Sequence, residues 1–175
     1  FPHHMIFLPK NYKSSFEDLF YSKKFPNGMP FYTSSPSTSD SSLAPKGKST
    51  MFVLVPLPIA ETSKQKNIYS KDLKKIKDKV FEKFNHHNID LNEKDIEFEK
   101  VLTPDDWKTK FGLYKTSAFG SSHNLFNIGP FRDTNKSKNI KGLYFVGAST
   151  NPGTGLPMVT LSGKLASERI INDIS

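Results

Sequence analysis

The residues best suited to chemistry lie in a short stretch from Gly147 to Val159, where glycine and proline alternate with small polar side chains. Glycines such as Gly153 and Gly155 let a ligand approach the backbone closely. Apolar residues then recur at helical spacing from Met158 onward, so a helix is predicted to follow the loop. The first N–H groups of a helix have no partner inside it, and the helix dipole puts partial positive charge there. This stretch therefore suits a phosphate or another electron-rich group, including the pyrimidine side of a flavin.

Two elements must position this loop. Residues 143–146, Leu-Tyr-Phe-Val, form a short apolar run bounded by glycines, which predicts a strand buried on both faces. The unit is therefore strand, glycine-rich loop and helix. It is not the dinucleotide fingerprint, because Met158 stands where a third glycine is needed, and it lacks the Gly-Lys-Ser/Thr ending of a nucleotide-hydrolase loop. The same unit also occurs in α/β domains that bind nothing there, so the pattern alone leaves both interpretations open.

Apolar periodicity predicts alternating strands and helices in the rest of the chain, as expected for α/β or α+β proteins whose sheet is covered by helices. The expected strands lie at residues 1–8, 31–35, 51–55 and 96–98. The expected helices begin at Ser14, Ser70 and Thr103, and the second is amphipathic, with an apolar face made of Leu73, Ile76, Val80 and Phe84. Residues 36–48 are rich in Ser and Pro and are expected to form a surface loop.

Two ionisable residues are candidates for a catalytic role. His123 lies in a loop flanked by glycines and could orient a flavin or transfer a proton; the alternative is a histidine hydrogen-bonded to loop backbone. Arg132 could face a phosphate or a carboxylate, and the alternative is an ordinary ion pair. No metal site is expected, because the chain has no cysteine and the neighbours in each histidine pair point in different directions. The triplet Asn135-Lys-Ser137 matches a glycosylation sequon, a match that often arises by chance.

The segment from Gly142 to Val159 resembles the C-terminal flavin motif of the bacterial and fungal phytoene desaturases, Leu-Tyr-x-Val-Gly-Ala-x-Thr-His-Pro-Gly-x-Gly-x-Pro. It departs from that motif at Asn151, where the family usually has His. Other blocks along the chain look like the same family, so the resemblance covers nearly all of it. These blocks are Phe1-Pro-His-His with Ile6-Phe7, Phe31-Tyr32 through Ser34-Pro36 and Asp40, Ala44-Pro45 with Gly47-Lys48, Phe52 to Pro56, Thr103-Pro with Asp106-Trp107, Gly120-Ser-Ser-His123, and Gly129-Pro-Phe-Arg132.

The resemblance implies the C-terminal third or so of an α/β flavoenzyme, in which an FAD-binding (Rossmann-like) domain is interleaved with a substrate domain of mixed sheet and helices. Residues 1–140 are expected to belong to the substrate domain, and residues 141–175 to supply the final strand, glycine-rich loop and helix of the FAD-binding domain. The residues implied to contact FAD are Gly147, Ala148 and Ser149 near its ribityl or phosphate part, and Pro157, Met158 and Val159 beside the flavin ring.

The activity implied is dehydrogenation of phytoene or a related carotenoid, with FAD as the hydride acceptor, in carotenoid biosynthesis. The isolated chain is expected to be inactive and to hold FAD poorly. Two alternatives stay open: a saturase, isomerase or ketolase of the same flavoprotein superfamily that acts on related polyenes, and a degenerate, non-catalytic fragment.

The charge of the chain bears on its partners. The formal net charge is +8 and comes mainly from lysines that are spread along the chain instead of being grouped with aromatic residues, which does not favour nucleic-acid binding. An enzyme with a hydrophobic carotenoid substrate is expected to associate peripherally with an intracellular membrane surface; the alternative is that the lysines only solvate the protein. No apolar run approaches the roughly 20 residues that a membrane-spanning helix needs.

Overall fold

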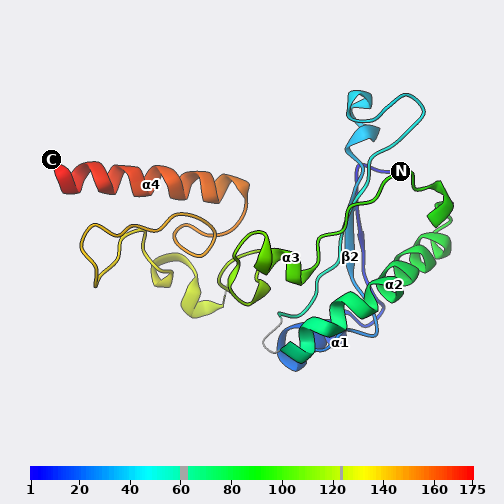
Figure 1. The fold of residues 1–175 in the computed structure, drawn as a ribbon, viewed down its shortest axis with the longest axis horizontal. Coiled ribbons are helices and arrows are strands. Elements are labelled where there is room, and N and C mark those ends of the chain that lie inside the picture. The colour runs from blue at the N-terminus through cyan, green and yellow to red at the C-terminus, as the bar shows by residue number, and fades with distance from the viewer. Residues whose placement is uncertain (60–62, 123) are drawn as a thin grey trace. The chain divides into compact units, whose positions relative to one another are not determined.

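The computed structural model describes residues 1–59, 63–122 and 124–175, and it contains two compact units, Phe1–Asp106 and Trp107–Ser175 (Figure 1). Helices combine with one small antiparallel sheet, which confirms the expected mixture of helix and strand. The predicted domain boundary between residues 140 and 141 falls inside the second unit and stays a prediction. Each unit is described below by itself.

The sheet of the first unit has three antiparallel strands in the order β1 (His4–Phe7), β2 (Phe31–Ser34) and β3 (Phe52–Leu54). Phe7 lies opposite Phe31 across the first pair, and Tyr32 lies opposite Leu54 across the second. All three strands were predicted, with bounds (1–8, 31–35 and 51–55) that extend beyond those of the structure, most of all for β1. Alternation of side chains along each strand directs Phe7 and Phe31 to one face and Tyr32 to the other.

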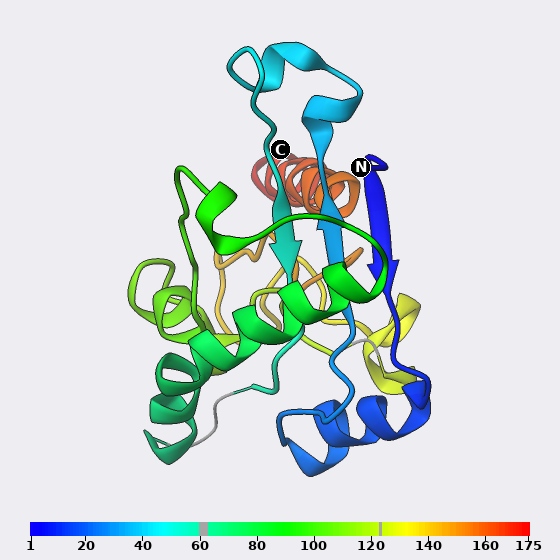
Figure 2. The same ribbon diagram turned by 90° about the vertical axis from the view of Figure 1, so that its right-hand side faces the viewer.

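Helix α2 (Ser63–His86) lies across that first face, as Figure 2 shows. Ile76, Val80 and Phe84 are buried against Phe7 and Phe31, which confirms the predicted apolar face of the helix. The rings of Phe7 and Phe31 stack with centroids 4.4 Å apart, and Phe84 meets Phe31 edge to face at 5.8 Å. The helix begins at Ser63, before the predicted Ser70, because residues 63–69 contain neither Gly nor Pro to end it.

The shorter elements of the first unit correct two predictions. Helix α1 (Tyr12–Glu17) is capped by Asn11, whose Oδ1 accepts a hydrogen bond from Ser14 N at 3.0 Å, so Ser14 lies inside the helix and is not its cap. A π-helical turn, Asp18–Ser22, follows directly. Residues 96–98 form no strand: they follow a 3₁₀ turn, Glu93–Asp95, and the side chain of Phe98 is 83% exposed. Among the described residues, this segment pairs with neither edge strand of the sheet, β1 or β3.

Helix α3 (Pro104–Thr109) has the predicted start, with Pro first, acidic residues in its first turn, and Asp106 Oδ2 accepting from Thr103 N at 2.8 Å. In the second unit, 3₁₀ turns at Tyr114–Thr116, Leu125–Asn127 and Gly129–Phe131 lead to the long helix α4 (Leu156–Ile174). Among the residues that the structure describes, no helix is both long and apolar enough to cross a membrane.

The run at residues 143–146 is not the buried strand that was predicted. Its only ladder contact in the described residues is a single antiparallel bridge between Tyr144 and Lys136. Phe145 is 45% exposed and Val146 is 61% exposed. A strand buried on both faces needs a neighbouring strand and a covering layer on either side. The described part of this unit supplies one bridging residue on one side, so the apolar side chains meet solvent.

Candidate functional site

The glycine-rich loop has a backbone that favours glycine at Gly147, Gly153 and Gly155, and the first and last of these face open space. Gly147 has φ = 118° and Gly155 has φ = 105°, values that side-chain-bearing L-residues rarely adopt. No described atom lies within 4 Å of a Cβ built on either residue, so both face open space. The loop thus offers two points where another molecule can come close to the main chain.

Helix α4 begins at the end of this loop without a side-chain cap. Gly155 occupies the N-cap position, Pro157 has no N–H, and Val159 N donates to Gly155 O at 2.9 Å. The N–H groups of Leu156 and Met158 precede the first hydrogen bond of the helix, so they remain for solvent or a ligand. The side chains of Pro157 and Met158 are exposed, and that of Val159 is half-buried. Apolar surface and free N–H groups therefore adjoin each other here.

Arg132 lies beneath the loop and is 2% exposed. Its Nε donates to Thr150 O at 3.0 Å, its Nη1 donates to Asn127 O at 2.8 Å, and its Nη2 donates to Ala148 O. These three backbone carbonyls take the place of the expected phosphate or carboxylate. The guanidinium therefore contacts the main chain of the loop from inside the protein.

Asn135 is a second buried contact to the loop, with an exposure of 0%. Its Nδ2 lies 3.1 Å from Phe145 O, 3.0 Å from Asn151 O and 3.0 Å from Ser162 Oγ. Ser162 Oγ, in the second turn of α4, also accepts from Gly147 N at 3.1 Å. One buried side chain thus ties the residue before the loop and the middle of the loop to the helix. Because the amide that would carry a glycan is enclosed in this way, the sequon match at Asn135 is ruled out as an accessible site in this fold.

Sequence reasoning missed the roles of Asn135 and Ser162. Buried polar residues that bond to main chain follow no helical or strand period, so the only signal at Asn135 was the sequon. Arg132 was singled out, but for a different partner. The candidate His123 lies outside the described residues. Nearby, Gly120 has φ = 75°, and a Cβ on it would lie 2.8 Å from Ala148 C, so this loop packs directly on the glycine-rich one.

The residues predicted to contact a cofactor are brought together around one loop. Gly147 and Ala148 are half-buried and Ser149 is exposed, and the bond from Gly147 N to Ser162 joins them to the start of α4. Within the described ranges, no cluster of three or more His, Cys, Asp or Glu side chains could hold a metal ion.

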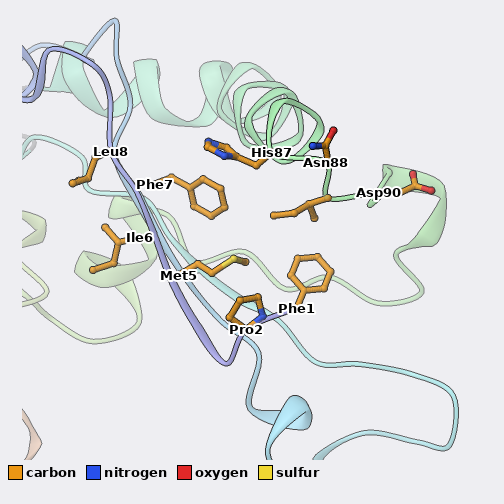
Figure 3. A pocket seen from close by; sticks show the side chains of 10 residues that line it. Phe1, Pro2, Met5, Ile6, Phe7, Leu8, His87, Asn88 and Asp90 are labelled. Atoms are coloured by element: carbon orange, nitrogen blue, oxygen red, sulfur yellow. The ribbon is translucent and has the colours of Figure 1, made fainter.

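A separate groove of about 660 Å³ lies in the first unit, between β1 and the end of α2 (Figure 3). Met5 and Phe7 point into it from β1, and His87 and Asp90 line its polar side. The ring of Phe7 meets that of His87 edge to face at 5.4 Å. None of the predicted cofactor residues lines this groove, which is mostly apolar.

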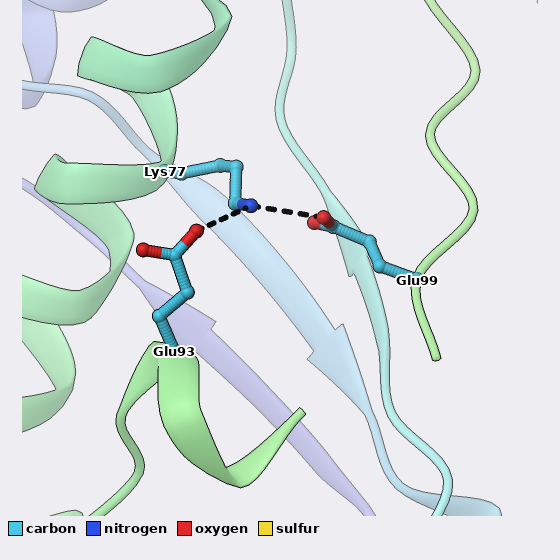
Figure 4. Close-up of polar contacts among 3 residues, drawn as sticks. All are labelled: Lys77, Glu93 and Glu99. Carbon is cyan, nitrogen blue, oxygen red and sulfur yellow. Dashed lines mark hydrogen bonds and ion pairs between the residues drawn. The ribbon is translucent and has the colours of Figure 1, made fainter. Parts of the chain in front are cut away.

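Lys77 on α2 is the centre of an ionic contact that holds the following segment to the helix (Figure 4). Its Nζ lies 2.9 Å from Glu99 Oε2 and 3.2 Å from Glu93 Oε1. The hydrogen bond to Glu99, more than that to Glu93, raises the pKa of Lys77. These contacts are structural in character, since they bind segment 93–99 to α2 through side chains that do not line the groove.

Comparison with known proteins gives matches along nearly the entire chain, although no family model matches it. The chain is 41% identical over 170 residues to a zeta-carotene-forming phytoene desaturase from Myxococcus xanthus, covering 97% of this chain and 32% of that protein. It is 36% identical over 175 residues to a phytoene desaturase from Phycomyces blakesleeanus, covering 95% and 29%. It is 31% identical to a 4,4'-diapophytoene desaturase from a Methylomonas species, covering 97% and 33%. The chain spans about a third of the length of these relatives.

Proposed function

We propose, from the premise that this chain belongs to the phytoene and carotenoid desaturases, that it is the C-terminal part of an FAD-dependent enzyme that desaturates phytoene or a related carotenoid in carotenoid biosynthesis. The observation that carries this proposal is identity of 31–41% over nearly the whole chain to three desaturases named for such substrates. The reaction is an oxidation of a CH–CH bond. In this proposal the chain supplies one part of the active protein and is inactive alone.

The finer fold is part of the proposal. Residues 141–175 form the last strand, loop and helix of a Rossmann-like FAD-binding domain, and residues 1–140 belong to an interleaved substrate domain. The sheet and α2 of the first unit suit a substrate domain, since they carry an apolar core and an apolar groove. The exposed run 143–146 then becomes a buried strand when the remaining strands of that sheet flank it.

The residues around the loop fit a flavin. Gly147 and Gly155 face open space among the described atoms, and the start of α4 presents free N–H groups beside exposed apolar side chains. A flavin has flat apolar ring faces and a polar pyrimidine edge, so it needs both kinds of surface. When bound, FAD supplies the hydride acceptor. The residues proposed to hold it are Gly147, Ala148 and Ser149 on the loop, and Pro157, Met158 and Val159 at the start of α4.

The chain's own contribution near this group is electrostatic and positional. Partial positive charge at the N-terminus of α4 stabilises negative charge placed beside it. The exposed apolar side chains of Val146 and Met158 exclude water from that surface once it is covered. A carotenoid offers no charged group for recognition, so its binding depends on apolar surface, for which the groove beside β1 is the candidate in the first unit.

Association with a membrane surface is also proposed, because a carotenoid substrate dissolves in lipid. The exposed Lys74 on α2, together with the net charge of +8, favours contact with anionic headgroups. The spread of the lysines gives no support to nucleic acid as a partner.

The test is to express the full-length protein that contains this chain in cells that accumulate phytoene and to record the absorption spectrum of the extracted pigment. New long-wavelength bands are expected, and their position counts the conjugated double bonds made. A folded protein that binds FAD and produces no colour contradicts desaturation and favours a saturase, isomerase or ketolase. A protein with neither colour nor flavin favours a degenerate fragment.

A further inference from the structure

We infer that Arg132 and Asn135 are positioning residues that hold the glycine-rich loop in the shape that the flavin site requires, and that Arg132 also places a positive charge beneath that site. This inference rests on the function proposed above. Neither residue is proposed to touch the substrate. Each acts through the main chain of the loop that it contacts.

The contacts of Arg132 fix the loop at several separated points. Its three donors reach Asn127 O, Ala148 O and Thr150 O, so the planar guanidinium joins a preceding turn to two alternate peptides of the loop. Asn151 Nδ2 returns a hydrogen bond to Arg132 O at 3.1 Å. No other amino acid presents a rigid set of donors that can span these carbonyls.

Fixing a carbonyl also fixes the N–H that follows it. In a trans peptide the C=O and the next N–H point in opposite directions. Because Ala148 O points at the buried guanidinium, the N–H of Ser149 points away from it, and no described residue accepts a hydrogen bond from that N–H. Ser149 is one of the residues expected to contact the cofactor. Arg132 thus orients a donor that is available to a ligand.

Asn135 holds the entrance and the middle of the same loop. Its Nδ2 contacts Phe145 O before the loop and Asn151 O within it, and it contacts Ser162 Oγ on α4. The backbone of Asn135 also accepts from Phe145 N at 2.8 Å. Since Ser162 Oγ accepts from Gly147 N, the open glycine is held at a fixed position relative to the start of the helix.

The charge of Arg132 has a consequence of its own. Its three acceptors are neutral carbonyls, so they satisfy its hydrogen bonds without cancelling the positive charge. Arg132 thus places a buried positive charge against the loop that leads into the positive end of the α4 dipole. Both favour an electron-rich group on the loop, and both stabilise the reduced form of a bound flavin, which gains negative charge.

The test uses the full-length protein and the two arginines of the chain. Arg132→Gln is compared with Arg169→Gln, which makes the same change at an exposed position of α4. We expect Arg132→Gln to weaken FAD binding about tenfold or more, while Arg169→Gln stays within about twofold of the parent protein. Binding is measured by titration with FAD, and the midpoint potential of the bound flavin is measured by spectroelectrochemistry.

Arg132→Lys separates charge from geometry. It retains the positive charge but cannot reach three carbonyls, so FAD binding is expected to weaken while the potential of the flavin stays near that of the parent. Arg132→Gln is expected to shift that potential to more negative values. A residue that only stabilised the fold would lower the melting temperature of both variants and leave the potential of the remaining bound flavin unchanged, and that result would overturn the inference.

A milder pair keeps the test decisive if Arg132→Gln does not fold. Ser162→Ala removes the acceptor shared by Gly147 N and Asn135 Nδ2, whereas Ser167→Ala makes the same change on the same helix where the hydroxyl bonds only to Lys164 O. We expect only Ser162→Ala to weaken FAD binding and alter the visible circular dichroism of the flavin. If the parent protein binds FAD and the two variants have the same FAD affinity and the same circular dichroism, the inference is overturned and the proposed function is not. A parent that binds no FAD overturns the proposed function, and the inference with it.

Discussion

The first unit is held together mainly by apolar and aromatic side chains, whereas the second is held mainly by buried polar groups. Phe7, Phe31 and Phe84 pack together in the first unit, and their neighbours are aliphatic, methionine and further phenylalanine side chains. In the second unit, by contrast, Arg132, Asn135 and Ser162 are buried, and Ala166 is the one fully buried apolar side chain among its described residues. The difference shows two ways of fixing a backbone: one uses close packing of apolar side chains, and the other uses directional hydrogen bonds from buried polar side chains.

These two kinds of interior differ in the substitutions that they tolerate. An apolar core accepts exchanges of similar volume, because dispersion contacts have little directionality. A polar network contributes well only when every member has its partner, and removal of one member leaves others unsatisfied. The glycine-rich loop is held in the second way, which sets the direction of each peptide group. Four measurements test this contrast, in order of decreasing expected effect.

Phe84→Ala should give the largest loss of stability. Phe84 is almost fully buried and contacts the rings of Phe7 and Phe31, so its truncation leaves a cavity in the core. We expect the free energy of unfolding to fall by about 3–5 kcal/mol, measured by urea denaturation of the full-length protein. Phe98→Ala, at an exposed position, is the control and should cost less than about 0.5 kcal/mol. Similar losses for both would contradict the core described here.

Asn135→Asp should have the next largest effect, although it hardly changes the volume of the side chain. It puts carboxylate oxygen where Nδ2 now faces Phe145 O, Asn151 O and Ser162 Oγ, so attraction becomes repulsion. We expect a loss of about 3 kcal/mol and faster hydrogen exchange at the amides of Phe145 and Gly147. Asn139→Asp, on the surface, makes the same change of charge and should leave exchange at those amides unaltered.

Gly120→Ala and Gly142→Ala form a matched pair. Both glycines have positive φ, 75° and 77°, so an alanine at either costs about 1–2 kcal/mol in backbone strain. Only at Gly120 does the new Cβ also meet the loop, 2.8 Å from Ala148 C. We expect Gly120→Ala to be the more destabilising by about 1 kcal/mol or more in chemical denaturation, because main chain must move. Equal losses would show that the two loops are not in contact.

The pH response of Asp173 should be the smallest effect. A hydrogen bond from Lys136, and then one from Tyr144, lower the pKa of the Asp173 carboxyl, and the same contact raises the pKa of Tyr144. Because the folded pKa of Asp173 lies below its unfolded value, this contribution is present above the unfolded pKa and is lost as pH falls through the folded one. NMR titration should find Asp173 below its ordinary range, and Lys136→Met should move it upward. A carboxyl that titrates normally in the parent would show that the cluster does not tie α4 to residue 136.

Sequence reasoning predicted the first unit better than the second, for a physical reason. Strands β1 to β3 lie in short apolar or β-prone runs, and the buried face of α2 leaves a period of 3.6 in the apolar residues; both signals are visible without any structure. The predicted start of α2, Ser70, lies seven residues after the observed start, Ser63. Residues 63–69 contain no helix-breaking residue, so the helix extends through them. The apolar alternation at 96–98 predicted a strand, but this segment pairs with neither edge of the sheet.

The loop itself was found through its glycines, but what holds it was not. Glycine and proline signal a turn in any context, so Gly147 and Gly155 were identifiable from the chain alone. The partners of Arg132 are main-chain carbonyls, which every residue carries, so nothing in the sequence distinguishes them from others. Asn135 and Ser162 are buried by contacts across 27 positions of sequence, and a pattern of near neighbours cannot detect such a pair.

The amide of Asn135 has two hydrogens, while three oxygen atoms lie within 3.1 Å of its nitrogen. Two protons therefore serve three acceptors, and one contact at any moment is shared or unmade. A small displacement of the loop can be met by exchanging which pair is bonded, at little cost in energy. The hydrogen bonds of Asn135 thus limit how far the loop can move. They still allow a small change in the loop conformation when a ligand binds next to Gly147.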